Sequence, residues 1–441
     1  MRHSNEVRGE LQLHPAFIAA GVCEIGGDLS SDCGLETEKE IYMTGMSTSQ
    51  LLEAAKKRLV YVTDRPPLIM QRGEGMYLFD TEGKRYLDFV GGWAVTALGH
   101  CPPVLLKALK EQAEILINCS PSFFNTGMIA FADLLVRHSC FDQAWFGNTG
   151  AEVNEAAIKI ARKYGTLHKK GAYEIITTEH SFHGRTLATM SATGKAQWAP
   201  LFEPKAGGFI HVPFNDLPAI QKTISDKTIA IMLELIQGEG GVNIADVAYM
   251  KGIRKLCDEQ GLLLIVDEVQ TGLGRCGTLF AYKQYGIEPD IMTLAKGIGA
   301  GYPLAAVLAK ERSCCFAAGD HGGTYGGNSL GMAVGIAVVE EIIERDLSSY
   351  AVRMGDYIKG KLSAEASRFN LTNLRGRGLL LAFDVPKEAG KAIVNKALAK
   401  GLLVNSPQPA SIRLMPPLIV EKGHVDEMIP ILRATLEEVL T

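Results

Sequence analysis

The sequence lacks the cysteine spacing of a metal site. Its nine cysteines include no Cys-x-x-Cys pair, and Cys314 and Cys315 are adjacent, whereas structural zinc sites need ligands at short, defined intervals. We therefore expect no bound metal ion. An odd number of cysteines in a chain of 441 residues favours reduced thiols, and hence a cytoplasmic protein.

Long apolar runs and a strong excess of one charge are also absent. No run approaches the ~18 residues that a membrane-spanning helix requires. The weakly apolar residues 16–22 are followed by Glu24, Asp28 and Asp32, unlike a signal peptide. The formal net charge of −4 offers no electrostatic reason to expect nucleic acid or an anionic membrane as a partner. A hydrophobic content of 47% and a charged content of 21% are typical of a globular enzyme.

The order of the predicted elements divides the chain into four parts. Residues 1–47 have weak hydrophobic periodicity and are predicted to form a flexible extension. Strand-like and helix-like segments alternate over 140–310, which predicts a mainly parallel, doubly wound α/β sheet. We therefore predict a large α/β domain over 98–330, a smaller α+β domain over 331–441, and a segment, 48–97, that joins the smaller domain.

Two charged residues follow apolar strand-like runs near the middle of the chain. Asp267 follows the run 262–266, and Lys296 follows the run 290–294. In an open α/β sheet the carboxyl ends of the strands form the ligand crevice, so both side chains should face it. A lysine among apolar neighbours has a lowered pKa and can form a Schiff base, and a carboxylate opposite could keep a pyridine nitrogen protonated. The alternative is a structural ion pair, and these two residues alone do not decide between them.

Two further stretches have glycine beside side chains that could meet a ligand. The turn 147–152 leads into a helix, and a helix N-terminus of this kind binds anions, although an ordinary capped helix explains the pattern as well. Gly165 is expected to end that helix. Trp93, beside a glycine pair, is either packed in the core or directed at a ligand.

Several motifs occur together in one order along residues 48–440, and as a set they resemble the class III pyridoxal-phosphate aminotransferases, in particular the acetylornithine and ornithine aminotransferases. The motifs are Gly-Asn-Thr-Gly-Ala-Glu at 147–152, Ser-Phe-His-Gly-Arg-Thr at 181–186, Gln-Gly-Glu-Gly-Gly at 237–241, Asp-Glu-Val-Gln-Thr-Gly-Leu-Gly-Arg at 267–275, Thr-Leu-Ala-Lys-Gly at 293–297 and Arg-Leu-Met-Pro-Pro-Leu at 413–418. The resemblance implies fold type I of the pyridoxal-phosphate-dependent transferases.

The resemblance also implies a role for each cofactor residue. Lys296 would bind the cofactor covalently and move a proton, and Asp267 would hold the pyridine nitrogen. The remaining residues would contact the ring or the phosphate: Gln270 at the ring hydroxyl, Phe182 and Val269 on the two ring faces, the backbone N–H groups of Gly150 and Ala151 at the phosphate, and Thr324 at the phosphate of the neighbouring subunit. A homodimer with shared active sites follows from the role of Thr324.

The substrate residues match the family in the same way. Arg185 would bind a substrate carboxylate through its guanidinium fork. Glu239 would mask Arg413 while an amino donor occupies the site and release it for the second carboxylate of 2-oxoglutarate, although a structural salt bridge remains an alternative for the pair. Trp93 is a further candidate for the substrate site.

From these matches we predict transfer of the terminal amino group of N-acetylornithine or an ornithine-like donor to 2-oxoglutarate, giving a semialdehyde and glutamate, as in arginine biosynthesis. Four departures from the family pattern leave the donor open: Leu235, Tyr325, Ser329 and the loop 120–127. One alternative is transfer from another ω-amine, such as a diamine, GABA or an intermediate of a specialised pathway. The others are a decarboxylase, racemase or aminomutase on the same scaffold, and a non-catalytic binding protein.

Overall fold

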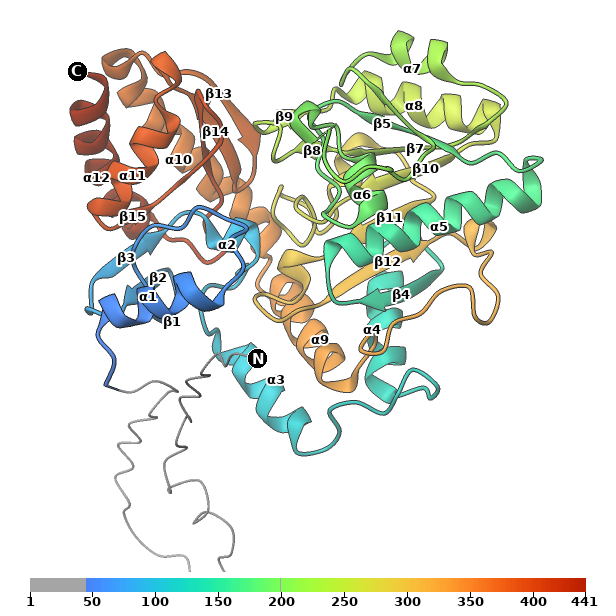
Figure 1. Ribbon diagram of the computed structural model, residues 1–441, viewed down its shortest axis with the longest axis horizontal. Coiled ribbons are helices and arrows are strands. Elements are labelled where there is room, and N and C mark those ends of the chain that lie inside the picture. Colours follow the sequence, from blue (N-terminus) through green and yellow to red (C-terminus); the bar gives the residue numbers. More distant parts are fainter. Residues whose placement is uncertain (1–44, 199) are drawn as a thin grey trace, which may run out of the picture.

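The computed structural model describes residues 45–198 and 200–441, so the extension predicted over 1–47 lies almost entirely outside the described residues. Figure 1 shows two main parts, a large sheet with its helices and a C-terminal part onto which the N-terminal strands fold. The first described helix is α1 (Thr48–Arg58), and it begins with a capping box between Ser47 and Gln50. No helix within the described ranges is long and apolar enough to cross a membrane.

The large sheet has seven strands in the order β4-β12-β11-β10-β7-β5-β6. Their bounds are β4 (Gln143–Gly147), β5 (Glu174–Thr178), β6 (Phe209–Val212), β7 (Thr228–Glu234), β10 (Leu263–Asp267), β11 (Ile291–Leu294) and β12 (Ala305–Ala309). The five strands from β11 to β6 are parallel, whereas β12 is antiparallel to both of its neighbours. The predicted mainly parallel α/β sheet is confirmed, and β6 and β12 were not predicted.

Both faces of this sheet are covered by helices, which explains the continuous apolar runs of its strands. On β10, Leu263 and Ile265 pack with helix α5 (Gly150–His168), while Leu264 and Val266 belong to the larger core cluster with helix α8 (Val247–Gln260). Successive side chains of a strand point to opposite faces. A strand between two helical layers therefore needs apolar residues at every position.

The prediction that Gly165 ends its helix is wrong, because α5 continues through Gly165 to His168. A Cβ atom at this position would overlap the carbonyl oxygen of Ala172. Glycine is needed there for a close approach between the helix and the segment that leads into β5, not for a left-handed cap.

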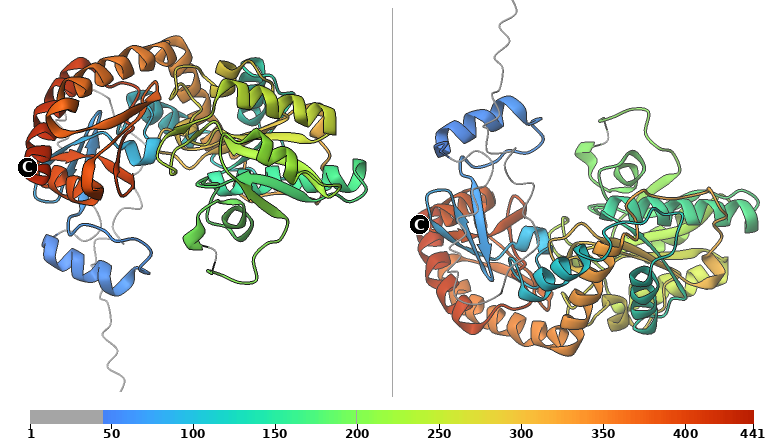
Figure 2. Two further views of the ribbon diagram at one scale, coloured as in Figure 1. Left: turned by 90° about the horizontal axis from the view of Figure 1, so that it is seen from above. Right: turned by 90° about the horizontal axis from the view of Figure 1, so that it is seen from below.

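The C-terminal part contains an antiparallel sheet in the order β13-β14-β17-β16. Its bounds are β13 (Thr372–Arg377), β14 (Leu380–Asp384), β16 (Asn405–Gln408) and β17 (Ser411–Leu414). Helices α10 (Leu347–Phe369), α11 (Gly390–Ala399) and α12 (Lys422–Leu440), orange to red in Figure 2, cover its outer side. Helix α9 (Ser329–Glu344) connects this part to the large sheet.

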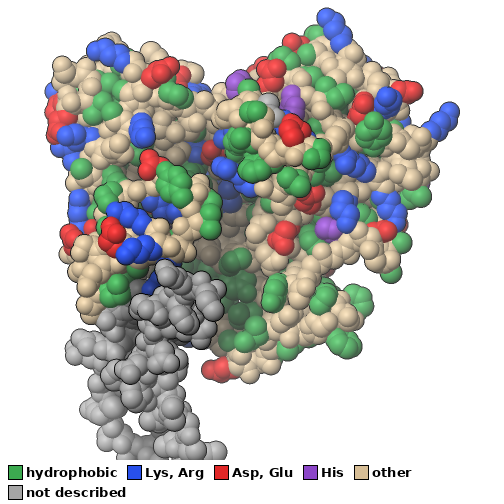
Figure 3. Space-filling model, in the orientation of Figure 1, with side chains coloured by type: hydrophobic (Ala, Val, Ile, Leu, Met, Phe, Trp, Pro, Cys, Tyr) green, Lys and Arg blue, Asp and Glu red, His purple; other side chains and the backbone are tan. Residues whose placement is uncertain are grey.

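The N-terminal strands pair with the C-terminal part. Strands β1 (Met70–Glu74), β2 (Tyr77–Asp80) and β3 (Arg85–Asp88) form a sheet with β15 (Leu402–Leu403), which runs parallel to β3. This pairing supports the division that we propose, in which 48–97 joins a small domain over 331–441 and 98–330 form the large domain. Figure 3 shows that the face between the two parts is hollowed.

The other elements are short or connect the main layers. They are α2 (Gly91–Ala94), α3 (Pro103–Ala113), α4 (Thr126–Arg137), α6 (Leu187–Ala192), α7 (Leu217–Thr223), β8 (Ile236–Gln237), β9 (Asn243–Ile244) and the 3-10 turns at Ala196–Trp198, Ala281–Tyr285, Lys296–Ile298, Glu311–Ser313 and Pro386–Glu388.

Candidate active site

A cavity of ≈ 550 Å³ lies at the carboxyl ends of β7, β10 and β11 and at the first turn of α5. This is the place where ligands bind in open α/β sheets. The predicted residues that line it are Gly150, Ala151, Phe182, Arg185, Glu239, Asp267, Val269, Gln270 and Lys296. Residues far apart in the sequence are thus brought together as predicted.

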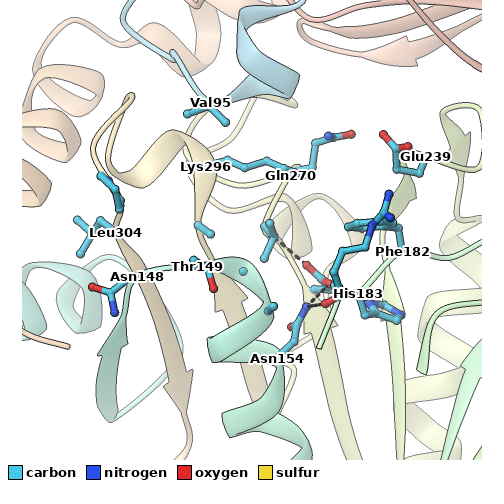
Figure 4. A pocket seen from close by; sticks show the side chains of 18 of the residues that line it. Val95, Asn148, Thr149, Asn154, Phe182, His183, Glu239, Gln270, Lys296 and Leu304 are labelled. Carbon is cyan, nitrogen blue, oxygen red and sulfur yellow. Dashed lines mark hydrogen bonds and ion pairs between the residues drawn. The ribbon is translucent and has the colours of Figure 1, made fainter. Parts of the chain in front are cut away.

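Asp267 is the last residue of β10, and its carboxylate is 3% exposed. Its Oδ2 accepts hydrogen bonds from Asn154 Nδ2 and His183 Nδ1, both at 2.8 Å, and its Oδ1 accepts one from Val269 N at 3.0 Å. The dashed lines in Figure 4 mark the contacts of Asn154 and His183. Three donors therefore hold the carboxylate in one orientation.

Lys296 follows β11 and begins a 3-10 turn with a left-handed backbone, φ 48°. Its side chain points toward Gln270 in the cavity (Figure 4). Burial lowers the pKa of the Lys296 amine, although Asp267 and Glu234 oppose this effect. An amine with a lowered pKa is neutral for a larger fraction of the time and can act as a nucleophile or a base.

Glu234 ends the neighbouring strand β7 and is paired in register with Asp267. Burial raises the pKa of Glu234 to about 7, with the charge of Asp267 adding to the rise and His183 opposing it. Its Oε2 accepts a hydrogen bond from Phe182 N at 3.0 Å. Glu234 thus orients the backbone of the loop that carries Phe182 and His183.

The first turn of α5 forms the anion-binding end of the cavity. Thr149 caps the helix by accepting a hydrogen bond from Glu152 N at 3.3 Å, and Glu152 in turn accepts from Asn148 N at 2.7 Å and Thr149 N at 2.8 Å. The first N–H groups of a helix have no partner inside the helix. Those of Gly150 and Ala151 therefore suit a phosphate.

Phe182 and Arg185 come from the loop after β5. The guanidinium of Arg185 is exposed and lies 4.4 Å from the ring centroid of Trp198 and 5.8 Å from that of Phe182. This stacking leaves the hydrogen-bonding edge of the guanidinium free to bind a carboxylate at the mouth of the cavity.

Arg413 on β17 and Glu239 form an ion pair at the side of the cavity nearest the C-terminal part. Arg413 Nη2 donates to Glu239 Oε1 at 2.7 Å and to Asn405 Oδ1 at 2.7 Å, and Arg413 Nη1 donates to Gln270 Oε1 at 3.4 Å. The Arg413 side chain is 0% exposed. The predicted contact between the two residues is therefore present.

Three candidates from the sequence do not line this cavity: Trp93, Thr324 and Arg413, which contacts the lining residues Glu239 and Gln270. Trp93 is 52% exposed, and Val95 lines the cavity in its place. Thr324 lies in the exposed stretch before α9. Its contribution to the site of a neighbouring subunit stays a prediction.

Asn154 and His183 contribute to the site, and neither was assigned a role from the sequence. His183 lies within the recognised Ser-Phe-His-Gly motif, but nothing in the local pattern indicates that its ring turns back to Asp267. Asn154 lies in the first turns of α5 and reaches Asp267 because α5 packs against β10. Both are buried polar residues, and their burial depends on how α5 and the loop after β5 pack against the sheet.

These residues fit pyridoxal phosphate. The N–H groups at the start of α5 suit its phosphate, the oriented Asp267 suits its ring nitrogen, and the partly buried amine of Lys296 suits its aldehyde carbon. Phe182 and Val269 line the cavity between these ends. A Cβ atom at Gly150 would lie 3.0 Å from Val269 Cγ1, so this end of the cavity needs a glycine.

Comparisons with known proteins identify the family of this chain. Residues 60–436 match the family model described as aminotransferase class-III. The acetylornithine aminotransferase of Ralstonia nicotianae is 49% identical over 386 residues, which cover 86% of this chain and 97% of that protein. The acetylornithine aminotransferase of Methanocaldococcus jannaschii is 43% identical over 400 residues, or 90% and 99% of the two chains.

Solved structures show the same relationship. The ornithine aminotransferase of Toxoplasma gondii superposes with a TM-score of 0.85 at 29% identity, over 89% of this chain and 96% of that chain. The acetylornithine aminotransferase of Elizabethkingia anophelis gives 0.79 at 30% identity, over 89% and 100%. The fold is therefore fold type I of the pyridoxal-phosphate-dependent transferases, and the chain belongs to the class III aminotransferases, which are pyridoxal-phosphate-dependent transaminases.

Proposed function

We propose that this enzyme transfers the terminal amino group of N-acetylornithine, or of a closely related ornithine-like donor, to 2-oxoglutarate. The observation that carries the proposal is the Arg413–Glu239 pair, with 2.7 Å between Arg413 Nη2 and Glu239 Oε1, because Glu239 lines the same cavity as Lys296 and Arg185. Arg185, which lines the cavity, and Arg413, which is paired with the lining residue Glu239, can bind the two carboxylates of a dicarboxylate oxo acid. The pair with Glu239 lets Arg413 be neutralised when the donor has a single carboxylate. Relatives that are up to about half identical are acetylornithine aminotransferases.

The residues divide the work as follows. Bound pyridoxal phosphate supplies an electron sink for negative charge at the carbon beside the donor nitrogen. Asp267, oriented by His183 and Asn154, would hold the proton on the pyridine nitrogen of that group. Lys296 Nζ moves a proton at the reacting carbon, which its lowered pKa permits. Arg185 fixes the donor carboxylate, so that the terminal amine reaches Lys296.

A homodimer and a cytoplasmic location belong to the same proposal. Exposed apolar side chains around the α3–α4 connection support a subunit interface there, and they are Ile115, Leu116, Ile117, Phe123, Phe124 and Ile129. Figure 3 shows apolar side chains gathered on this part of the visible face. The described cysteines are free thiols, as a reducing compartment requires.

The donor is tested with purified enzyme and no oxo acid, by following the visible absorbance of the bound cofactor. N-acetylornithine should bleach this band faster than free ornithine, GABA or putrescine, and glutamate should appear when 2-oxoglutarate is then added. Lys296→Ala should abolish turnover. If only another amine bleached the band, that amine would be the donor in place of N-acetylornithine. Full turnover of Lys296→Ala would contradict the assignment of the site.

A further inference from the structure

Glu239 lies between two positively charged side chains, each of which contacts a different oxygen of its carboxylate. Arg413 Nη2 donates to Oε1 at 2.7 Å, and Lys195 Nζ lies 3.5 Å from Oε2. The exposed fractions of the side chains are 0% for Arg413, 16% for Lys195 and 25% for Glu239. Lys195 is not among the residues that line the cavity, so it acts on the site through Glu239.

The local structure places Lys195 at this position. Gly194, just before it, donates from its N–H to Ser181 Oγ at 3.0 Å and forms a parallel bridge with Glu179. The Lys195 ammonium lies 5.2 Å from the ring centroid of Phe182 and 5.4 Å from that of Trp198. The ammonium is therefore held between two aromatic rings and one carboxylate.

The main chain at Glu239 is also held, so a movement of this residue would be confined to its side chain. Gln408 Nε2 donates to the carbonyl oxygen of Glu239 at 2.9 Å. Burial opposes ionisation of the carboxylate, but Arg413, Lys195 and Lys296 together hold the pKa of Glu239 below its usual value. Glu239 is thus a charged side chain that needs a counter-ion in every state of the site.

We propose that Lys195 is a positioning residue, the second counter-ion that retains Glu239 when Arg413 leaves it to bind the distal carboxylate of a dicarboxylate oxo acid. This inference rests on the proposed function, because it assumes that Arg413 alternates between Glu239 and an acceptor. With Lys195 present, the departure of Arg413 does not leave a charged carboxylate without a partner. Lys195 thereby makes binding of the dicarboxylate more favourable without contacting it.

The test compares kcat and KM for two oxo acids, 2-oxoglutarate with two carboxylates and pyruvate with one, in the holoenzyme at a fixed donor concentration. Lys195→Met should raise the KM for 2-oxoglutarate by about tenfold, which corresponds to ~1.4 kcal/mol. The KM for pyruvate should stay within about twofold, because Arg413 need not leave Glu239 for an acceptor with a single carboxylate. Lys195→Arg should restore the KM for 2-oxoglutarate. Lys195→Gln, which keeps a polar side chain, should repeat the effect of Lys195→Met.

Lys205→Met is the matched control, because Lys205 lines the neighbouring cavity with Lys195 and is paired with Glu203 at 4.0 Å rather than with Glu239. It should behave as the wild type. An unchanged KM in both Lys195→Met and Lys195→Gln, an equal rise for both oxo acids, or the same effect in Lys205→Met would overturn the role of Lys195 while leaving the proposed function intact. A wild type that does not prefer 2-oxoglutarate over pyruvate would instead overturn the proposed acceptor, and the role of Lys195 with it.

Discussion

Burial and neighbouring charges shift the pKa values of two side chains that line the cavity, Lys296 and Glu234. Burial lowers the pKa of Lys296 and raises that of Glu234 to about 7. His183 Nδ1 donates to Asp267, and its Nε2 has no hydrogen-bond partner among the described residues. Asn154 Nδ2 donates to the same carboxylate, so two side chains from other elements fix the orientation of Asp267. The cavity therefore combines an amine with a lowered pKa and a carboxylate held in one orientation.

Glu234 should make the stability of the enzyme depend on pH. Its pKa is about 7 in the folded chain, against the ordinary glutamate value of 4.5, so the native state binds more protons between these values and the free energy of unfolding falls as pH rises through them. Glu234→Gln cannot titrate. From about pH 5 to about pH 8 it should therefore gain stability relative to the wild type in thermal unfolding. If the melting temperatures of the two proteins changed in parallel over this pH range, the prediction would be contradicted.

At the scale of elements, the site depends on where strands end and where α5 begins. Asp267 and Glu234 are the last residues of parallel neighbouring strands, so the register of the sheet alone brings them together. The capping box of Thr149 and Glu152 determines where α5 starts, and thus where the N–H groups of Gly150 and Ala151 point. The α5 helix must then lie close to the sheet for Asn154 to reach Asp267.

A substitution at Gly165 tests how much this close packing of α5 contributes to stability. In Gly165→Ala the added methyl group would overlap the carbonyl oxygen of Ala172, and we expect a loss of ~1–3 kcal/mol in the free energy of unfolding. Gly360→Ala is the matched control, since Gly360 is an exposed residue of helix α10 with no atom within 4 Å of the new methyl group. It should gain up to ~1 kcal/mol, because alanine is the better helix former. Urea unfolding measures both, and equal effects would show that close packing at Gly165 is unimportant.

At the scale of the whole molecule, the cavity of one chain contains every predicted cofactor residue except Thr324. Thr324 and Tyr325 are exposed, as are Phe123 and Phe124 in the connection before α4. An exposed polar residue beside large apolar side chains suits a subunit interface better than an open surface. A second copy of the chain would then complete the phosphate end.

Mixed dimers test that arrangement. Lys296→Ala alone should be inactive, and Thr324→Ala alone should lose activity by about tenfold or more through weaker phosphate binding. In a hybrid of the two chains, the site with an intact Lys296 would receive an intact Thr324 from its partner, so co-expression should restore activity. The hybrids are isolated with two different affinity tags. If they showed no recovery of activity, Thr324 would act within its own chain.

Much of the fold and most of the cofactor site could be predicted, because their signals are local. A strand buried on both faces must be apolar at every position, as in 262–266, and a polar residue directly after it must lie at the sheet edge. The capped first turn of α5 is likewise a short-range pattern, and the resemblance assigned roles to residues such as Phe182 and Gln270. These features depend on neighbours within a few positions in the sequence.

Other features depended on segments distant in the sequence. The continuation of α5 past Gly165 follows from contact with Ala172, the orientation of Asp267 from Asn154 and His183, and the ion pair of Lys195 from the position of Glu239. A side chain shows its type in the sequence but not its partner, because pairing requires two elements to be packed at a set distance. The sequence by itself therefore determined the sheet, the lysine and the carboxylate, whereas only the tertiary structure decided which groups orient and neutralise them.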